Sequence, residues 1–141
     1  MIVEKSCGAV VYTIVNNTRK YVIICSTSGI YGFPKGHMEN DETEEETALR
    51  EIKEETNLDV NILDGFRTIE EHTFYKGNEK RLKRVAYFIA KYENQKFKPQ
   101  ESEISNIRLM DYDEAMKSFQ YDNSKRVLKE VEDYLNSNGS E

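Results

Sequence analysis

The sequence predicts one α+β domain built on a mixed β-sheet. Segments rich in β-branched residues recur from the N-terminus to about residue 92. An acidic segment with a helix-start signal interrupts them after residue 42, and the last thirty residues have helical periodicity. With 141 residues and 38% hydrophobic content, the chain is long enough to bury a core of its own. This order of elements favours a single α+β unit.

The first part of the chain predicts two strands, a loop and a helix. Residues 2–15 alternate in part, and residues 21–27 are nearly all apolar, which is typical of a central strand. Residues 16–20 predict the turn between them, and residues 28–37 contain two glycines before Gly36 and a proline, which predicts a loop. Thr43 and Glu46 form a capping-box pattern, so we expect a helix that runs to about Thr56.

The second part predicts further strands and then helices. We expect strands at 58–66, 68–75 and 82–92, a hairpin turn at 76–80, and a short strand at 107–110 after a polar stretch. Asp111 is the predicted cap of the next helix. The final helix, at 122–135, places four apolar residues on one face: Val127, Val131, Tyr134 and Leu135. The expected domain covers 1–136, with a flexible tail at 137–141.

Composition limits the classes of function. The net charge is −6 and no block rich in Lys and Arg occurs, which argues against binding of duplex nucleic acid. Cys7 and Cys25 lie in apolar runs and are expected to be buried thiols. No apolar run has the length of a membrane span, and the N-terminus lacks the order of a signal peptide. We therefore expect a cytoplasmic protein, monomer or homodimer, without a membrane partner.

Three carboxylates share one face of the predicted acidic helix. Glu51 and Glu55 differ by about 40° around the helix axis, and Glu54 lies about 60° to the other side. Like charges at this spacing destabilise a helix, and Arg50 and Lys53 are expected on other faces. A bound magnesium ion would relieve the repulsion because Mg²⁺ prefers oxygen ligands. A solvated surface helix remains the alternative.

The acidic helix is part of a longer motif. Gly36, Glu42 and the segment "REIKEETNL" at 50–58 match the spacing of glycine, glutamate and Arg-Glu-apolar-any-Glu-Glu. This pattern resembles the Nudix box of the Nudix hydrolases, and Asn57 replaces the last glycine of the motif. Because asparagine tolerates the left-handed backbone conformation of a helix end, we interpret this departure as structural and mild. The resemblance implies the Nudix fold, an α/β/α sandwich with the box as loop-helix-loop.

The resemblance also implies roles for the residues of the box. Glu51, Glu54 and Glu55 become ligands of Mg²⁺, with Mn²⁺ as an alternative metal, and Glu51 is also a candidate general base. Arg50 would hold a glutamate by a charge-assisted hydrogen bond, and Glu42 would support the ligands without binding metal directly. Three further oxygen ligands outside the helix are candidates: Glu103, which we favour, Glu101, and the carbonyl of Lys35.

The flanks of the box resemble one subgroup, the asymmetric diadenosine tetraphosphate hydrolases. Four segments carry this likeness, at 6–12, 33–40, 62–66 and 83–92. It implies five substrate contacts: phosphate contacts from Lys35, His37 and Lys83, and base stacking on Tyr75 and Tyr87. Three of them have a plainer interpretation: Lys83 could be an edge-strand charge, Tyr87 a core residue, and His37 a solvated loop residue.

The sequence therefore predicts an enzyme that hydrolyses a phosphoanhydride bond in a nucleoside polyphosphate by attack of water on phosphorus. The subgroup implies cleavage of diadenosine tetraphosphate to ATP and AMP. Two alternatives stay open: pyrophosphohydrolysis of nucleoside triphosphates, oxidised ones included, or of capped RNA, and a non-catalytic nucleotide-sensing module. The sensing module is disfavoured because every carboxylate of the box is present.

Overall fold

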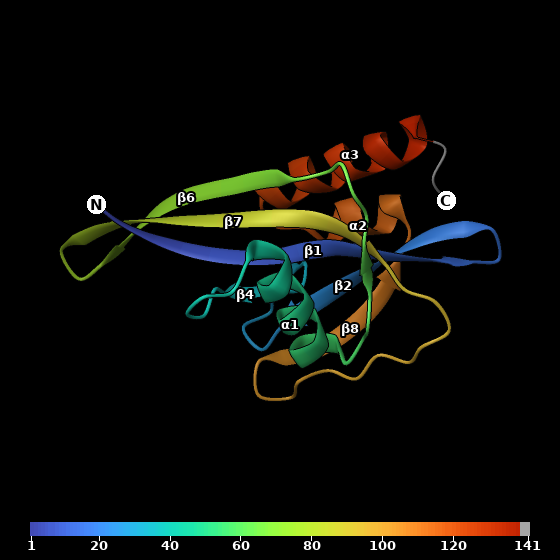
Figure 1. The fold of residues 1–141 in the computed structure, drawn as a ribbon, viewed down its shortest axis with the longest axis horizontal. Helices are drawn as coiled ribbons and strands as arrows, with labels where there is room; N and C mark the ends of the chain where they lie inside the picture. The colour runs from blue at the N-terminus through green and yellow to red at the C-terminus, as the bar shows by residue number, and fades with distance from the viewer. Residues whose placement is uncertain (139–141) are drawn as a thin grey trace.

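The computed structural model describes residues 1–138 and places them in one eight-stranded sheet with three helices (Figure 1). Along the chain the strands are β1 (Ile2–Val15), β2 (Thr18–Ser26), β3 (Tyr31–Gly32), β4 (Lys35–His37), β5 (Asn61–Ile62), β6 (Thr68–Lys76), β7 (Glu79–Lys91) and β8 (Ile104–Met110). The helices are α1 (Glu44–Thr56), between β4 and β5, and α2 (Tyr112–Ser118) and α3 (Asp122–Ser137) after β8.

The sheet is mixed, as predicted. β1 pairs in parallel with β7 over eleven residues, from Ile2 opposite Arg81 to Tyr12 opposite Lys91, and every other strand pairing of the described residues is antiparallel. β1 and β2 are paired only between 12–15 and 18–21. Beyond that point β4 pairs with β1 and β3 pairs with β2, so the two short strands lie where the long ones diverge.

Helices cover both faces of the sheet, which confirms the α/β/α sandwich. On one face α1 packs Ala48 and Ile52 against the alternate residues Cys7, Ala9 and Val11 of β1. On the other face α2 and α3 pack on a second core that is built from the intervening β1 residues and their neighbours (Figure 1). In α3 the apolar face consists of Val127, Leu128, Val131 and Leu135, all fully buried, with Tyr134 partly buried.

The predicted helix ends are confirmed. Thr43 and Glu46 exchange both hydrogen bonds of a capping box at the start of α1. Asp111 and Glu114 do the same for α2. The last helix extends to Ser137, two residues beyond the predicted 135, and residues 139–141 of the predicted tail lie outside the described residues.

Four local predictions were wrong. The segment 58–66 forms only the two-residue β5, because Gly65 takes a left-handed conformation (φ 92°) that ends the strand. The predicted loop at 28–37 contains β3 and β4. The strand predicted at 107–110 begins at Ile104, which pairs with Ser26 across a register shift. Cys25 is only half-buried, whereas Cys7 is buried as expected. No helix of residues 1–138 is long and apolar enough to cross a membrane.

Candidate active site

Strand β4 and the second half of α1 bring the motif glycine against the motif glutamates. Gly36 lies so close to Glu51 that a Cβ atom at residue 36 would be 2.1 Å from the Glu51 carboxyl carbon. The backbone N–H of Lys35 donates a hydrogen bond to Glu55 Oε1 (3.2 Å). The glycine is therefore required by the close approach of its strand to a carboxylate of the helix.

Arg50 links the carboxylates of the motif. Its Nε and Nη2 donate to the two oxygens of Glu42 (2.6 and 3.0 Å). Its Nη1 reaches Glu51 (2.7 Å) and Glu54 (3.1 Å), and Nη2 also donates to the carbonyl of His37 (2.9 Å). These contacts lower the pKa of Glu42 to about 2. The predicted charge-assisted hydrogen bond from Arg50 to a glutamate is present: Arg50 begins on a neighbouring helix face, and its long side chain bends back over the carboxylates.

The three carboxylates on one face differ in burial. Glu55 is buried, and burial raises its pKa to about 8, with the charge of Glu51 adding to the effect. Burial also raises the pKa of Glu51. Glu54 is the exposed member of the three, with 47% of its side chain accessible. The protein therefore keeps two of the carboxylates away from water, which is costly without a cation.

The loop before β8 reaches the same end of α1. The amide of Gln100 donates to the Glu55 carbonyl (3.2 Å), and the amide of Glu103 donates to the Gln100 carbonyl (3.1 Å). The Glu103 charge lies near enough to raise the pKa of both Glu51 and Glu55. This charge interaction supports Glu103, the loop carboxylate that the sequence favoured.

The donor set fits a hard divalent cation. In residues 1–138 no three His, Cys, Asp or Glu side chains are gathered into a complete metal site, because Glu51 and Glu54 turn toward Arg50. Among the described residues, one hydrogen-bond donor reaches the buried Glu55 carboxylate, the amide of Lys35. Carboxylate oxygens that are buried, close together and short of donors suit Mg²⁺ or Mn²⁺.

A cavity of about 630 Å³ is lined by Lys35, the residue whose amide donates to Glu55, but by none of the three motif carboxylates. Lys35 and Lys83 line it, and the two ammonium groups are adjacent: burial first, and then the charge of Lys83, lowers the pKa of Lys35. Two neighbouring cations in a cavity attract an anion such as a phosphate group. The wall continues with aromatic residues and with the start of α3 at Asn123 and Ser124.

Three of the five predicted substrate residues line this cavity, and two do not. Lys35, Lys83 and Tyr87 line the cavity. Tyr87 is only 3% exposed, lies edge-on to Phe33 (5.5 Å between ring centroids) and belongs to the core, so its ring faces are covered. The side chain of His37 is exposed, and Tyr75 is 69% exposed beside the β6–β7 hairpin; neither lines the cavity formed by the described residues.

Sequence reasoning missed four cavity residues. Glu70 is buried on β6 and lies next to Tyr87, whose pKa is raised by burial and by the Glu70 charge. His72, Tyr31 and Tyr121 also line the cavity, and Tyr121 is 56% exposed. The alternation along β6 puts Glu70 on the same face as Thr68, which was the signal for an inward-facing charge. The two tyrosines lie in loops or short strands where periodicity gives no signal.

Asn57 ends α1 in the left-handed conformation (φ 64°), and its N–H donates to the Lys53 carbonyl (2.9 Å). We expect Asn57→Ala to lower the free energy of unfolding by about 1 kcal/mol, because a Cβ without a polar group disfavours this conformation. Asn57→Gly, which restores the motif glycine, should stay within about 0.5 kcal/mol of the parent. Urea unfolding measures both. An alanine variant as stable as the glycine variant would contradict a left-handed cap.

The buried Glu55 makes stability depend on pH. Its pKa is 4.5 in ordinary surroundings and about 8 in the fold, so between these values the folded protein holds a proton that the unfolded chain releases. The protonated Glu55 contributes its full stabilisation below pH 4.5. As the pH rises from 4.5 to about 8 this contribution is lost, and the free energy of unfolding falls by at most about 1.4 kcal/mol per pH unit.

We therefore expect the melting temperature in EDTA to fall across this range. Added Mg²⁺ should raise it most at the alkaline end, because the cation competes with the proton. Differential scanning fluorimetry at several pH values tests this, with Glu55→Gln as the variant that should flatten the EDTA curve. If the melting temperature of Glu55→Gln in EDTA falls with pH as steeply as that of the parent, groups other than Glu55 cause the pH dependence.

Comparison with known proteins agrees with this geometry. The NUDIX domain model matches residues 6–131. The chain is 30% identical to the "Bis(5'-nucleosyl)-tetraphosphatase [asymmetrical]" of Sus scrofa and 28% identical to that of Rattus norvegicus, in each case over 93% of this chain and 95% of the relative. A crystal structure of a C. elegans Ap4A hydrolase binary complex superposes with a TM-score of 0.82 at 23% identity, covering 95% of this chain and 98% of that one. The chain belongs to the Nudix family and is a Nudix hydrolase.

Proposed function

We propose that this Nudix hydrolase cleaves diadenosine tetraphosphate to ATP and AMP in a reaction that requires Mg²⁺, with Mn²⁺ as a substitute. The observation that carries the proposal is the arrangement of the buried Glu55 and the partly buried Glu51 next to Lys35, which lines a cavity together with Lys83. The identities of 28–30% to asymmetrical tetraphosphatases along nearly their whole length support the choice of substrate.

The carboxylates of α1 hold the divalent cation in this proposal. Glu51, Glu54 and Glu55 are its side-chain ligands, with Glu103 and the Lys35 carbonyl as further oxygen donors. When bound, the cation neutralises phosphate oxygens and lowers the pKa of the attacking water. Arg50 fixes the orientation of Glu51 and Glu54 through its hydrogen bonds, and Glu42 anchors Arg50 from the other side.

Neighbouring side chains accept the proton and bind the substrate. Glu51, partly buried and next to Gly36, is the proposed proton acceptor for the attacking water. Lys35 and Lys83 bind the phosphate chain from inside the cavity. Of the aromatic residues at the cavity, Tyr31 and Tyr121 have accessible rings, so they suit base stacking better than the buried Tyr87.

Product analysis tests the proposal. The protein is incubated with diadenosine tetraphosphate and Mg²⁺ in water enriched in ¹⁸O. The products are separated by ion exchange, and the ¹⁸O content of each is measured by mass spectrometry. We expect equal amounts of ATP and AMP, with ¹⁸O in only one of them, because water attacks a single phosphorus. Glu54→Gln and Glu55→Gln proteins run alongside should lose the activity.

Other outcomes identify other substrates. Two molecules of ADP would show symmetrical cleavage and contradict the proposal. No turnover would also reject it and lead to a panel of nucleoside triphosphates, from which a pyrophosphohydrolase releases monophosphate and pyrophosphate. Activity that persists in both glutamine variants would leave the substrate in place and reject the assigned metal ligands.

A further inference from the structure

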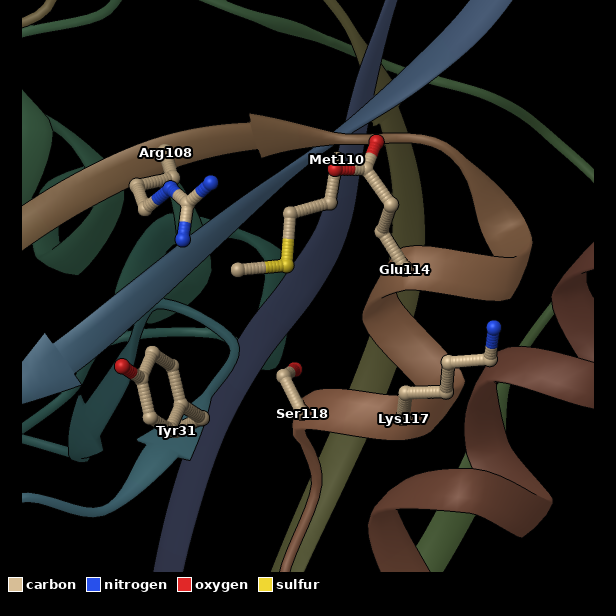
Figure 2. A pocket seen from close by; sticks show the side chains of 6 residues that line it. All are labelled: Tyr31, Arg108, Met110, Glu114, Lys117 and Ser118. Carbon is tan, nitrogen blue, oxygen red and sulfur yellow. The ribbon is translucent and has the colours of Figure 1, made fainter.

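A second cavity lies on the same side of the sheet as α2. It has a volume of about 310 Å³, and its walls come from β3, β8 and α2 (Figure 2). Six side chains line it: Tyr31, Arg108, Met110, Glu114, Lys117 and Ser118. The family motif and the roles assigned above use none of them except Tyr31.

The cavity is lined by two cationic side chains, Arg108 and Lys117, and by the aromatic ring of Tyr31 and the thioether of Met110. In residues 1–138 no carboxylate lies within ion-pair distance of the Arg108 guanidinium, which is exposed at the cavity. The Glu114 carboxylate has other partners: it accepts a hydrogen bond from the Asp111 amide (3.2 Å) and lies 3.9 Å from the Lys20 ammonium group. A planar guanidinium, an aromatic ring and a thioether that line one cavity suit a ligand with a heteroaromatic ring.

Tyr31 lies between this cavity and the larger one. It is the residue that lines both, so one ring forms a common wall between the space beside Lys35 and the space beside Arg108. Figure 2 shows the Arg108 and Met110 side chains extending over the region between the two strands and α2, with Tyr31 on the opposite side. The two cavities therefore lie next to each other, with Tyr31 between them.

We propose that the small cavity binds the second nucleoside of the substrate, with Arg108 contacting its base. This inference rests on the proposed function, because only a substrate with two nucleosides needs a second base site. The volume of about 310 Å³ holds one nucleoside, and the planar guanidinium of Arg108 suits a heteroaromatic base. Nucleoside triphosphates, which have one base, do not use this cavity.

Comparison of two ligands tests the proposal. Diadenosine tetraphosphate has both nucleosides, whereas adenosine 5′-tetraphosphate has the same phosphates and only one nucleoside. We expect Arg108→Gln to raise the KM for diadenosine tetraphosphate by at least about tenfold, as for loss of a hydrogen bond to a charged group. The inhibition constant of adenosine tetraphosphate, measured against the same reaction, should change less than about twofold.

Lys129→Gln is the matched control, because it removes the same charge from an exposed site on α3 where Lys129 pairs with Asp133. It should leave both constants unchanged. An equal rise in both constants for Arg108→Gln, or no rise in either, would overturn the proposal. If the unmodified protein does not cleave diadenosine tetraphosphate, the proposed function has failed, and that result is seen before any variant is compared.

Discussion

Replacing Glu55 by glutamine is expected to lower kcat by at least about a hundredfold, because even residues that only support metal ligands are worth ten- to a hundredfold. Glu55 is buried, and the Lys35 amide is its hydrogen-bond donor among the described residues, so its charge has no substitute. Glutamine has nearly the same shape and keeps the hydrogen bond to Lys35, so the fold should persist. Steady-state kinetics at saturating Mg²⁺ measure the effect.

The control for this prediction lies on the same helix. Glu45 is exposed in the first turn of α1, and Glu45→Gln makes the same chemical change without touching the cluster. It should retain nearly full activity. Without metal, Glu55→Gln should be at least as stable as the parent at pH 8, because it removes a buried charge. A Glu55→Gln enzyme with a kcat within threefold of the parent would exclude Glu55 as a ligand.

Replacing Gly36 by alanine is expected to abolish most activity while costing little stability. The new Cβ would lie 2.1 Å from the Glu51 carboxyl carbon, so Glu51 must swing away from its position. The atoms displaced are the end of a flexible side chain, which lets the fold adjust. A shift of about 1 Å in a catalytic group can reduce the rate about a hundredfold. The measurements are kcat/KM and the melting temperature of the same preparation.

Two other glycines provide reference points for stability. At Gly32 an added Cβ meets nothing within 4 Å, so Gly32→Ala should leave the stability near that of the parent. At Gly8 the Cβ would lie 2.1 Å from the Pro34 carbonyl oxygen, which is backbone, so Gly8→Ala should destabilise the protein by about 1–3 kcal/mol or more. If Gly36→Ala lost stability as Gly8→Ala does, the role of Gly36 would be packing and not the placement of Glu51.

The predicted and observed elements agree best where local signals are strong. The capping boxes at Thr43 and Asp111 and the hairpin between β6 and β7 depend on neighbours within a few residues, so the sequence contains all the needed information. The segment 58–66 failed because its apolar residues are not one strand: Leu58 packs under α1, and the chain turns at Gly65. Periodicity does not show which neighbour covers a residue.

The same limit applies to the site. The spacing within the motif placed Glu51, Glu54 and Glu55 on one helix face, but it could not distinguish buried Glu55 from exposed Glu54. That difference arises because β4 and the loop at 98–104 cover one end of α1 through backbone hydrogen bonds over long sequence separations. The reach of Arg50 across three carboxylates likewise depends on its side-chain conformation, which helix geometry alone does not give.

By itself the sequence determined the α+β class, the position of the acidic helix and its motif, and the glutamates that form the candidate metal site. Those features follow from spacing along one helix and from local hydrogen bonds. Only the tertiary structure decided that Lys35 and Lys83 meet in one cavity, that Tyr87 is a core residue, and that Tyr31 separates two cavities. The physical reason is that these residues are brought together by strand register and by helix packing between distant segments, which no local pattern encodes.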